Sequence, residues 1–180
     1  TNLKTLGLDK NRISDISVLA SLTNLEVLSL AGNQISDISV LASLTNLEAL
    51  YLRDNTISDI SVLSNLTKLQ QLYLNGNKIS DISSLASLTN LQYLSLNSNE
   101  LNSAAYAIHI PALEAKGISL EYDPKDNSSD INNDGSINIF DLVAVASQFG
   151  QSGENLDGDV NGDGTVNIFD LVEVAQNFGK

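Results

Sequence analysis

A motif of the form L-x-x-L-x-L-x-x-N recurs five times between Leu3 and Asn99. The asparagines that close it are 22 residues apart, at Asn11, Asn33, Asn55, Asn77 and Asn99. Self-similarity at a fixed period of about 20–50 residues is typical of stacked units, none of which can bury its own apolar face. The period therefore predicts that residues 2 to about 110 form a solenoid in which each unit packs on its neighbours.

The pattern inside one unit predicts its local structure. Leu6 and Leu8 alternate with small or polar residues, which is typical of a strand with one buried side. Apolar residues then recur at every third position, which suits a 3₁₀ helix because positions i and i+3 eclipse there. These residues are Ile13, Ile16, Leu19 and Leu22. We expect an α/β solenoid with a parallel sheet on its concave face and 3₁₀ segments on its convex face.

The unit resembles the leucine-rich repeat, and its continuation I-S-D-I-S-x-L-x-x-L-T resembles the 22-residue internalin type found in bacteria. We expect the Asn column to form an internal hydrogen-bonded ladder, because buried polar groups need partners. An Asp column lies on the opposite side of the units, at Asp15, Asp37, Asp59 and Asp81. We expect these carboxylates to cap the 3₁₀ segments rather than to bind cations.

The repeat pattern breaks after Asn99. Residues 102–116 are expected to be helical but interrupted by Pro111, and residues 118–122 to form a last strand. This segment, about 99–122, would cap the solenoid and shield its last leucines from water. The polar stretch 123–129 marks a linker. The sequence thus predicts a solenoid domain at 1–122 and a second domain at 130–180.

The second domain contains the motif D-x-N-x-D-G-x-[IV]-N-I-F-D twice, and 14 of 21 aligned residues are identical between 130–150 and 159–179. A calcium ion takes about 6–8 oxygen ligands, which a 12-residue loop supplies from positions 1, 3, 5, 7, 9 and 12. The candidate ligands of the first loop are Asp130, Asn132, Asp134, the Ser136 carbonyl, Asn138 (through water) and Asp141. Those of the second are Asp159, Asn161, Asp163, the Thr165 carbonyl, Asn167 and Asp170. Two calcium ions are therefore expected.

A short helix should follow each loop, with Leu142, Val145, Ala146 and Phe149 on its inner face and Gly150 ending it. A loop followed by one helix, duplicated, resembles a type I dockerin, an EF-hand-like module. The resemblance implies that calcium folds the module and that the module binds a cohesin domain on another protein. Dockerins commonly use loop positions 10 and 11 for this contact. Those positions are Ile139–Phe140 and Ile168–Phe169 here, an apolar pair that either contacts the partner or packs inside the module.

The solenoid offers a second candidate binding surface. Strand parity places Tyr51, Tyr73 and Tyr93 on the exposed side of the concave sheet, with Arg53 beside them. Tyr and Arg are the residue types that most often anchor interfaces. We expect these four residues to form a ligand-binding patch, against the alternative that the tyrosines are ordinary cross-strand neighbours.

Composition limits the classes of function. The net charge of −13 argues against nucleic acid and anionic membrane surfaces, and no apolar run reaches the length needed for membrane insertion. The chain contains no cysteine. It carries no nucleophile–base pair or zinc ligand set, so we do not expect an enzyme. Calcium loops with three carboxylates suit the calcium levels outside cells, so an extracellular location, secreted or on the cell surface, is expected. Because the chain begins inside a repeat and lacks a signal peptide, we expect it to be part of a longer protein.

Two functional hypotheses follow. In the first, the chain is a non-catalytic adhesion or scaffold protein whose repeats bind a protein or glycan, while the calcium module attaches it to a cohesin-like partner. In the second, the calcium module is a structural cap or a calcium-dependent self-association element without a cohesin partner.

Overall fold

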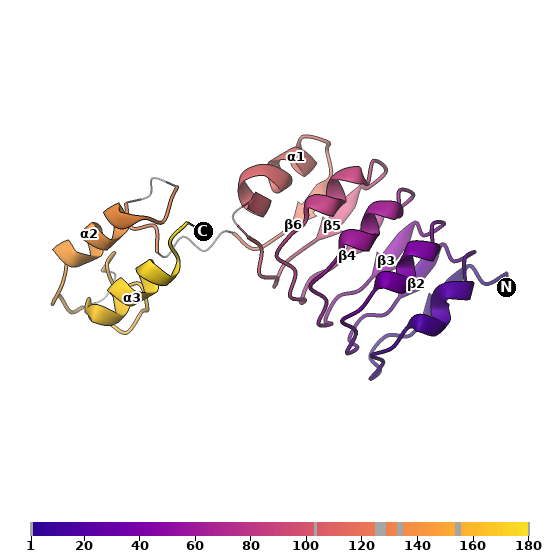
Figure 1. Ribbon diagram of the computed structural model, residues 1–180, viewed down its shortest axis with the longest axis horizontal. Coiled ribbons are helices and arrows are strands. Elements are labelled where there is room, and N and C mark those ends of the chain that lie inside the picture. The colour runs from indigo at the N-terminus through magenta and orange to yellow at the C-terminus, as the bar shows by residue number, and fades with distance from the viewer. Residues whose placement is uncertain (1, 103, 125–128, 133–134, 154–155, 180) are drawn as a thin grey trace. The chain divides into compact units, whose positions relative to one another are not determined.

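The computed structural model describes residues 2–102, 104–124, 129–132, 135–153 and 156–179. The chain divides into two compact units, Thr1–Asp123 and Pro124–Lys180 (Figure 1). Most of the predicted linker, residues 125–128, lies outside the described residues, so the linker itself stays a prediction.

The first unit is built on one parallel sheet whose six strands follow chain order (Figure 1). The strands are β1 Thr5–Gly7, β2 Val27–Ser29, β3 Ala49–Tyr51, β4 Gln71–Tyr73, β5 Tyr93–Ser95 and β6 Ser119–Glu121. The 22-residue period sets the register, because Leu6, Leu28 and Leu50 align across three successive strands. The predicted solenoid with a parallel sheet is confirmed.

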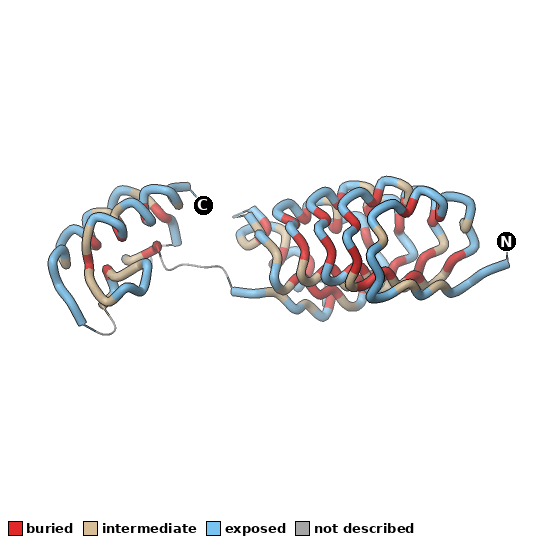
Figure 2. The backbone as a smooth tube through the Cα atoms, turned by 90° about the horizontal axis from the view of Figure 1, so that it is seen from below, coloured by how far each residue is buried: buried red, intermediate tan, exposed pale blue. Residues whose placement is uncertain are grey.

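The leucines of the repeats form one continuous core. Side chains such as Leu50 and Leu72 are fully buried, and buried residues recur along every coil (Figure 2). The Asn ladder is also confirmed. The amide nitrogen of Asn55 donates to the carbonyls of Leu30 and Leu52, both at 3.0 Å, and its Oδ1 accepts from Ile35 N at 3.0 Å. The ladder thus satisfies turn carbonyls and amides that no strand partner reaches.

Short 3₁₀ helices form the side of each repeat opposite the sheet. They are η1 Ser17–Ser21, η2 Ser39–Ser43, η3 Ser61–Asn65 and η4 Ser83–Ser87. The Asp column satisfies the first N–H of each helix, as in Ser17 N, which donates to Asp15 Oδ1 at 2.8 Å. These backbone hydrogen bonds hold the pKa of all four carboxyls below its ordinary value. The predicted capping role is therefore confirmed.

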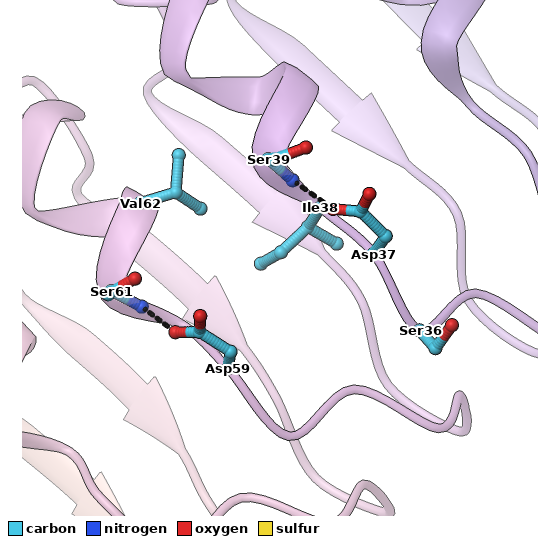
Figure 3. A pocket seen from close by; sticks show the side chains of 7 residues that line it. All are labelled: Ser36, Asp37, Ile38, Ser39, Asp59, Ser61 and Val62. Atoms are coloured by element: carbon cyan, nitrogen blue, oxygen red, sulfur yellow. Dashed lines mark hydrogen bonds between the residues drawn. The ribbon is translucent and has the colours of Figure 1, made fainter.

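A pocket between two of these repeats is lined in part by Asp37 and Asp59 (Figure 3). Each carboxylate accepts from the N–H of the serine two residues on, at 2.8 Å. The carboxylates in this pocket therefore accept hydrogen bonds from the first N–H groups of η2 and η3.

The end of the solenoid differs from the prediction in one respect. A π-helical turn η5, Ala105–His109, leads directly into helix α1, Ile110–Glu114. The helical backbone is unbroken from residue 104 to residue 114, and Pro111 lies one residue after the change from π to α geometry. Proline lacks the N–H that would continue the hydrogen bonds to the preceding turn, so it marks this change of geometry instead of ending the helical stretch. The predicted last strand is present as β6, which pairs with β5, and Ile110, Leu113 and Ile118 are buried against the last repeat.

The described part of the second unit contains two nine-residue helices, α2 Ile139–Ser147 and α3 Ile168–Gln176. Among its described residues, a small core is formed by Ile137, Val145, Val166 and Val174, and partly buried residues such as Leu142 and Leu171 support it. In the described parts of both units, no helix is long and apolar enough to span a bilayer.

The predicted inner face of these helices is partly wrong. Leu142 and Val145 belong to the core, but Ala146 and Phe149 are exposed, as are Ala175 and Phe178. For Phe149 the reason is that α2 ends at Ser147. Phe149 lies beyond that end, so it no longer follows the 3.6-residue period that would turn it inward.

Candidate metal centres and contact surfaces

A left-handed glycine bends each candidate loop at position 6. Gly135 has φ +86° and Gly164 has φ +84°, a conformation that residues with a Cβ rarely adopt. The turn points the glycine N–H back at the aspartate in position 1. Gly135 N donates to Asp130 Oδ2 at 3.0 Å, and Gly164 N donates to Asp159 Oδ2 at 2.8 Å.

The aspartate in position 12 ties the two ends of each loop together. Asp141 and Asp170 are fully buried. Asp141 accepts from the backbone N–H of Asn132 at 3.2 Å and from that of Asn138 at 2.8 Å. The second loop repeats these bonds around Asp170, at 3.2 and 2.7 Å. Position 12 is thereby linked to positions 3 and 9 of its own loop.

Position 9 has a second role that the sequence analysis missed. Asn138 is the N-cap of α2: its side chain accepts from Phe140 N at 2.9 Å and donates to the Ser136 carbonyl at 2.8 Å. Asn167 does the same for α3. The N-x-x-D spacing resembles a capping box and was the available signal.

The second loop is described at all six ligand positions. Asp163 N donates to Asp159 Oδ1 at 3.0 Å and to Asn161 Oδ1 at 2.8 Å, and Thr165 N donates to Asp163 Oδ1 at 2.9 Å. Asp134, the corresponding position-5 ligand of the first loop, lies outside the described residues. Within the described ranges, no three carboxylates are close enough to hold a metal by themselves. In the second loop, amide and carbonyl oxygens would therefore have to complete a cation site.

This donor set fits a hard cation. All candidate ligands are oxygens, which calcium prefers. A carboxylate oxygen has two lone-pair directions, so one hydrogen bond to a loop amide leaves a direction for an ion. The loops are thus already held in shape by the amides, while their carboxylates retain coordinating capacity.

The apolar pairs at loop positions 10 and 11 are exposed at the start of each helix. Ile139 and Phe140 keep 57% and 66% of their surface exposed, and Ile168 and Phe169 keep 55% and 67%. The alternative that these pairs pack inside the module is wrong. Val143 and Val172 extend the same exposed apolar surface one turn along each helix.

On the solenoid, the three tyrosines form a ladder across the concave sheet. The rings of Tyr51 and Tyr73 stack at 4.7 Å between centroids and 16° between planes, and Tyr73 meets Tyr93 at 4.8 Å and 38°. All three are half-buried, whereas Arg53 is exposed. Partial burial, helped by a hydrogen bond to Glu121, raises the pKa of Tyr93 above its ordinary value.

Each of the two units matches a known protein family. A model of leucine-rich repeats in two copies matches residues 1–43, 45–87 and 67–107. The type I dockerin domain matches residues 128–179. Type I dockerins bind calcium, typically two ions, which agrees with the donor set of both loops. Both are non-catalytic modules, and neither match identifies a catalytic domain. A search of curated proteins found no match.

Solved structures with this fold include internalins of Listeria monocytogenes. Internalin C2 is 37% identical, with a TM-score of 0.60 over 67% of this chain and 52% of its own. A second internalin, inlF, is 28% identical, with a TM-score of 0.52 over 71% of this chain and 45% of its own. A repeat protein of Leptospira interrogans, 24% identical with a TM-score of 0.55 over 67% of this chain and 37% of its own, shares the fold. The chain spans about half or less of each of these structures.

The repeat matches cover more than half of the chain, and the strand register and Asn ladder show the same unit in three dimensions. The chain therefore belongs to the leucine-rich repeat family, with internalin-like structural neighbours, and its repeats are followed by a type I dockerin domain.

Proposed function

We propose that the chain is a non-catalytic extracellular adaptor that binds one partner with its repeats and another with its calcium module. In this proposal the concave face takes a protein or glycan ligand, and the module attaches the chain to a cohesin-like partner. The observation that carries it is the exposed pair Ile139–Phe140, repeated as Ile168–Phe169 beside the second loop.

The position of these pairs supports an attachment role that depends on calcium. Each pair directly follows the N-cap asparagine of its helix, and that asparagine is itself a loop residue. An ion bound in the loop would therefore fix the backbone that presents the pair. Exposed apolar surface of this kind is costly in water and typical of contact sites. The proposed ions are two Ca²⁺, held by the twelve loop positions given above, Asp134 included.

The concave face supports a separate ligand site at Tyr51, Arg53, Tyr73 and Tyr93. Within the ladder, the rings of Tyr51 and Tyr73 stack and the ring of Tyr73 is tilted against that of Tyr93. The ring faces inside the ladder are therefore covered, and ring edges and hydroxyls remain for a ligand. Tyr51 Oη already lies 3.3 Å from Gln71 Oε1, which shows that the hydroxyls reach polar neighbours. Edges, hydroxyls and the exposed Arg53 favour a protein ligand over a glycan that would need a free ring face.

The proposed location outside the cell is supported by the calcium loops and by the internalin-like repeats. Extracellular calcium modules work at about 10⁻⁴–10⁻³ M calcium, a concentration at which loops of this composition would be filled.

The test of attachment is a binding assay of the full chain on a panel of immobilised type I cohesin modules, in calcium and in chelator. We expect calcium-dependent binding to at least one module. The double variant Phe140→Ala/Phe169→Ala should lose it, whereas Val18→Ala, which truncates a solenoid residue that is 79% exposed, should not. Binding that persists in the double variant would contradict the assigned surface.

The same two apolar pairs are also what a self-associating module would need, since one module carries two equivalent surfaces. Light scattering in calcium and in chelator separates the two functions. A monomer in calcium supports attachment to a different protein. A calcium-dependent dimer that Phe140→Ala/Phe169→Ala disrupts, together with no cohesin binding, would replace the attachment proposal by self-association.

A further inference from the structure

In the calcium module, the C-terminal end of each helix contacts the chain beside the other helix's calcium loop. Gln148, the C-cap residue of α2, accepts through Oε1 from Gly158 N at 3.1 Å. Gly158 immediately precedes Asp159, the first residue of the second loop. Asn177, the C-cap residue of α3, donates to Ser129 Oγ at 3.1 Å, and Ser129 immediately precedes the first loop.

A second pair of contacts repeats this exchange through the backbone. Beyond the end of α2, Gly150 N donates to the carbonyl of Val166, at position 8 of the second loop, at 2.8 Å. Beyond the end of α3, Gly179 N donates to the carbonyl of Ile137, at position 8 of the first loop, at 3.1 Å. Ile137 and Val166 are core residues of the module, so these bonds lie where loop and core meet.

The opposite end of each helix is held by its own loop. The α2 helix begins at Asn138, and its first turn carries Asp141, whose carboxylate binds two amides of the first loop. Asn167 and Asp170 hold α3 in the same way. The first loop, α2, the second loop and α3 therefore form a closed circuit, in which every helix joins two loops.

Packing at Gly158 shows that the α2 end of this circuit is tight. A Cβ placed on Gly158 would lie 3.1 Å from Val166 Cγ1 and 3.3 Å from the Cβ and Cδ of Gln148. Gly158 is buried, so the Gln148 side chain lies directly on the entry to the second loop. A shift of α2 is thus transmitted to that loop by contact as well as by the hydrogen bond.

We infer that the two calcium sites are coupled through α2 and α3, so that filling either loop raises the affinity of the other. An ion in one loop fixes the start of its own helix, and the far end of that helix then orders the entry to the other loop. The second ion pays less of the ordering entropy, which is positive cooperativity. This inference rests on the proposed loading of both loops with calcium.

The test is calorimetric titration of calcium into the chelator-stripped full chain and into Gln148→Ala/Asn177→Ala. This variant removes both side-chain links and changes no candidate ligand. Its matched control is Ser147→Ala/Gln176→Ala, one position earlier on each helix, where both side chains are exposed. A third protein, Asp130→Asn, disables the first loop so that the second can be measured alone.

We expect the wild type and the control to bind two ions, the second more tightly than independent sites allow, and the link variant to bind two ions independently. The second loop should also be at least about fivefold weaker in Asp130→Asn than in the intact chain, a typical lower bound for coupling between sites. This last comparison decides the matter even if the link variant fails to fold.

Two ions bound independently by the wild type, or an unchanged affinity of the second loop in Asp130→Asn, would overturn the coupling and leave the proposed function standing. Equal cooperativity in the wild type and in a folded link variant would overturn the assigned route. Binding of no calcium would overturn both the coupling and the calcium-dependent attachment.

Discussion

The two units of this chain differ in how much buried core stabilises them. In the solenoid, successive repeats add buried leucines to one continuous core, as Leu50 and Leu72 do for β3 and β4. Among the described residues of the dockerin domain, the buried core is formed by Ile137, Val145, Val166 and Val174. So small a core rarely offsets the entropy of folding without a metal or another cross-link. From this comparison we expect packing to stabilise the first unit and metal binding to stabilise the second.

The buried polar residues of the two units also differ in whether the chain alone satisfies them. Asn55 is satisfied entirely by its own chain, since its amide and its oxygen both bind turn groups of the repeats. Asp141 and Asp170 also accept two backbone N–H groups each, and a carboxylate has further lone pairs that these two bonds leave open to a cation. The buried polar residue of the solenoid therefore finds all its hydrogen-bond partners within the folded chain, whereas the buried aspartates of the loops are suited to bind a cation as well.

The largest expected effect is the removal of ligands from both loops. Asp134→Ala/Asp163→Ala should abolish calcium-dependent folding of residues 130–179, because metal-binding energy is folding energy for such a module. Circular dichroism during a calcium titration should show a helical change in the wild type and none in the variant. The solenoid should keep its own melting transition. Loss of both transitions in the variant would show that the stability of the solenoid also depends on the loops, against the proposed difference between the two units.

Next in size is truncation of the solenoid core. Leu72→Ala should lower the free energy of unfolding of the repeats by about 3–5 kcal/mol, because Leu72 is fully buried and the cavity cannot collapse easily. Chemical denaturation followed by circular dichroism measures this, and Val18→Ala, at an exposed site, should cost less than about 0.5 kcal/mol. Calcium should alter neither value. A calcium-dependent cost of Leu72→Ala would show that the solenoid also relies on the metal.

A smaller effect is expected from the Asn ladder. Asn55→Ala should cost about 2 kcal/mol, because it leaves the buried N–H of Ile35 without its partner. It also removes one of two donors from the carbonyls of Leu30 and Leu52, which the neighbouring Asn33 and Asn77 still reach. Asn11, at the exposed start of the ladder, donates only to the carbonyls of Leu8 and Asp9, so Asn11→Ala should cost less than about 1 kcal/mol. Denaturation of the two variants side by side gives both values. Equal costs would mean that the ladder contributes through local turns and not through stacking.

The smallest effect is a dependence of solenoid stability on acid. The folded-state pKa of Asp15, Asp37, Asp59 and Asp81 lies below its ordinary value. Ionised carboxylates therefore stabilise the repeats above about pH 4, and this contribution is lost as the pH falls through the lower folded-state values. Thermal melts in chelator from pH 5 to pH 2 should show the decline, and replacing all four with Asn should reduce it. An unchanged decline would assign the acid sensitivity to other carboxyls.

The sequence predicted most of the solenoid because its information is periodic. A repeat of 22 residues places Leu6, Leu28 and Leu50 in one column, so the register follows as soon as stacking is assumed. The same logic correctly placed Tyr51 beside Tyr73, although no pattern could give the stacking of their rings.

Prediction was weaker in the dockerin domain for two physical reasons. The expected inward position of Phe149 was wrong because the helix stops at Ser147, and helix ends are the least regular part of an apolar pattern. The links from Gln148 to Gly158 and from Asn177 to Ser129 join residues that are distant in sequence. The spacing of residues within one short motif does not predict such contacts.

The most direct test of the account is differential scanning calorimetry of the whole chain in calcium and in chelator. Its central claim is that packing stabilises the repeats, while calcium stabilises the dockerin domain. We predict two transitions in calcium, of which chelator removes or lowers only the one assigned to residues 130–179. A single transition that shifts as a whole, or two transitions that both ignore chelator, would contradict the claim.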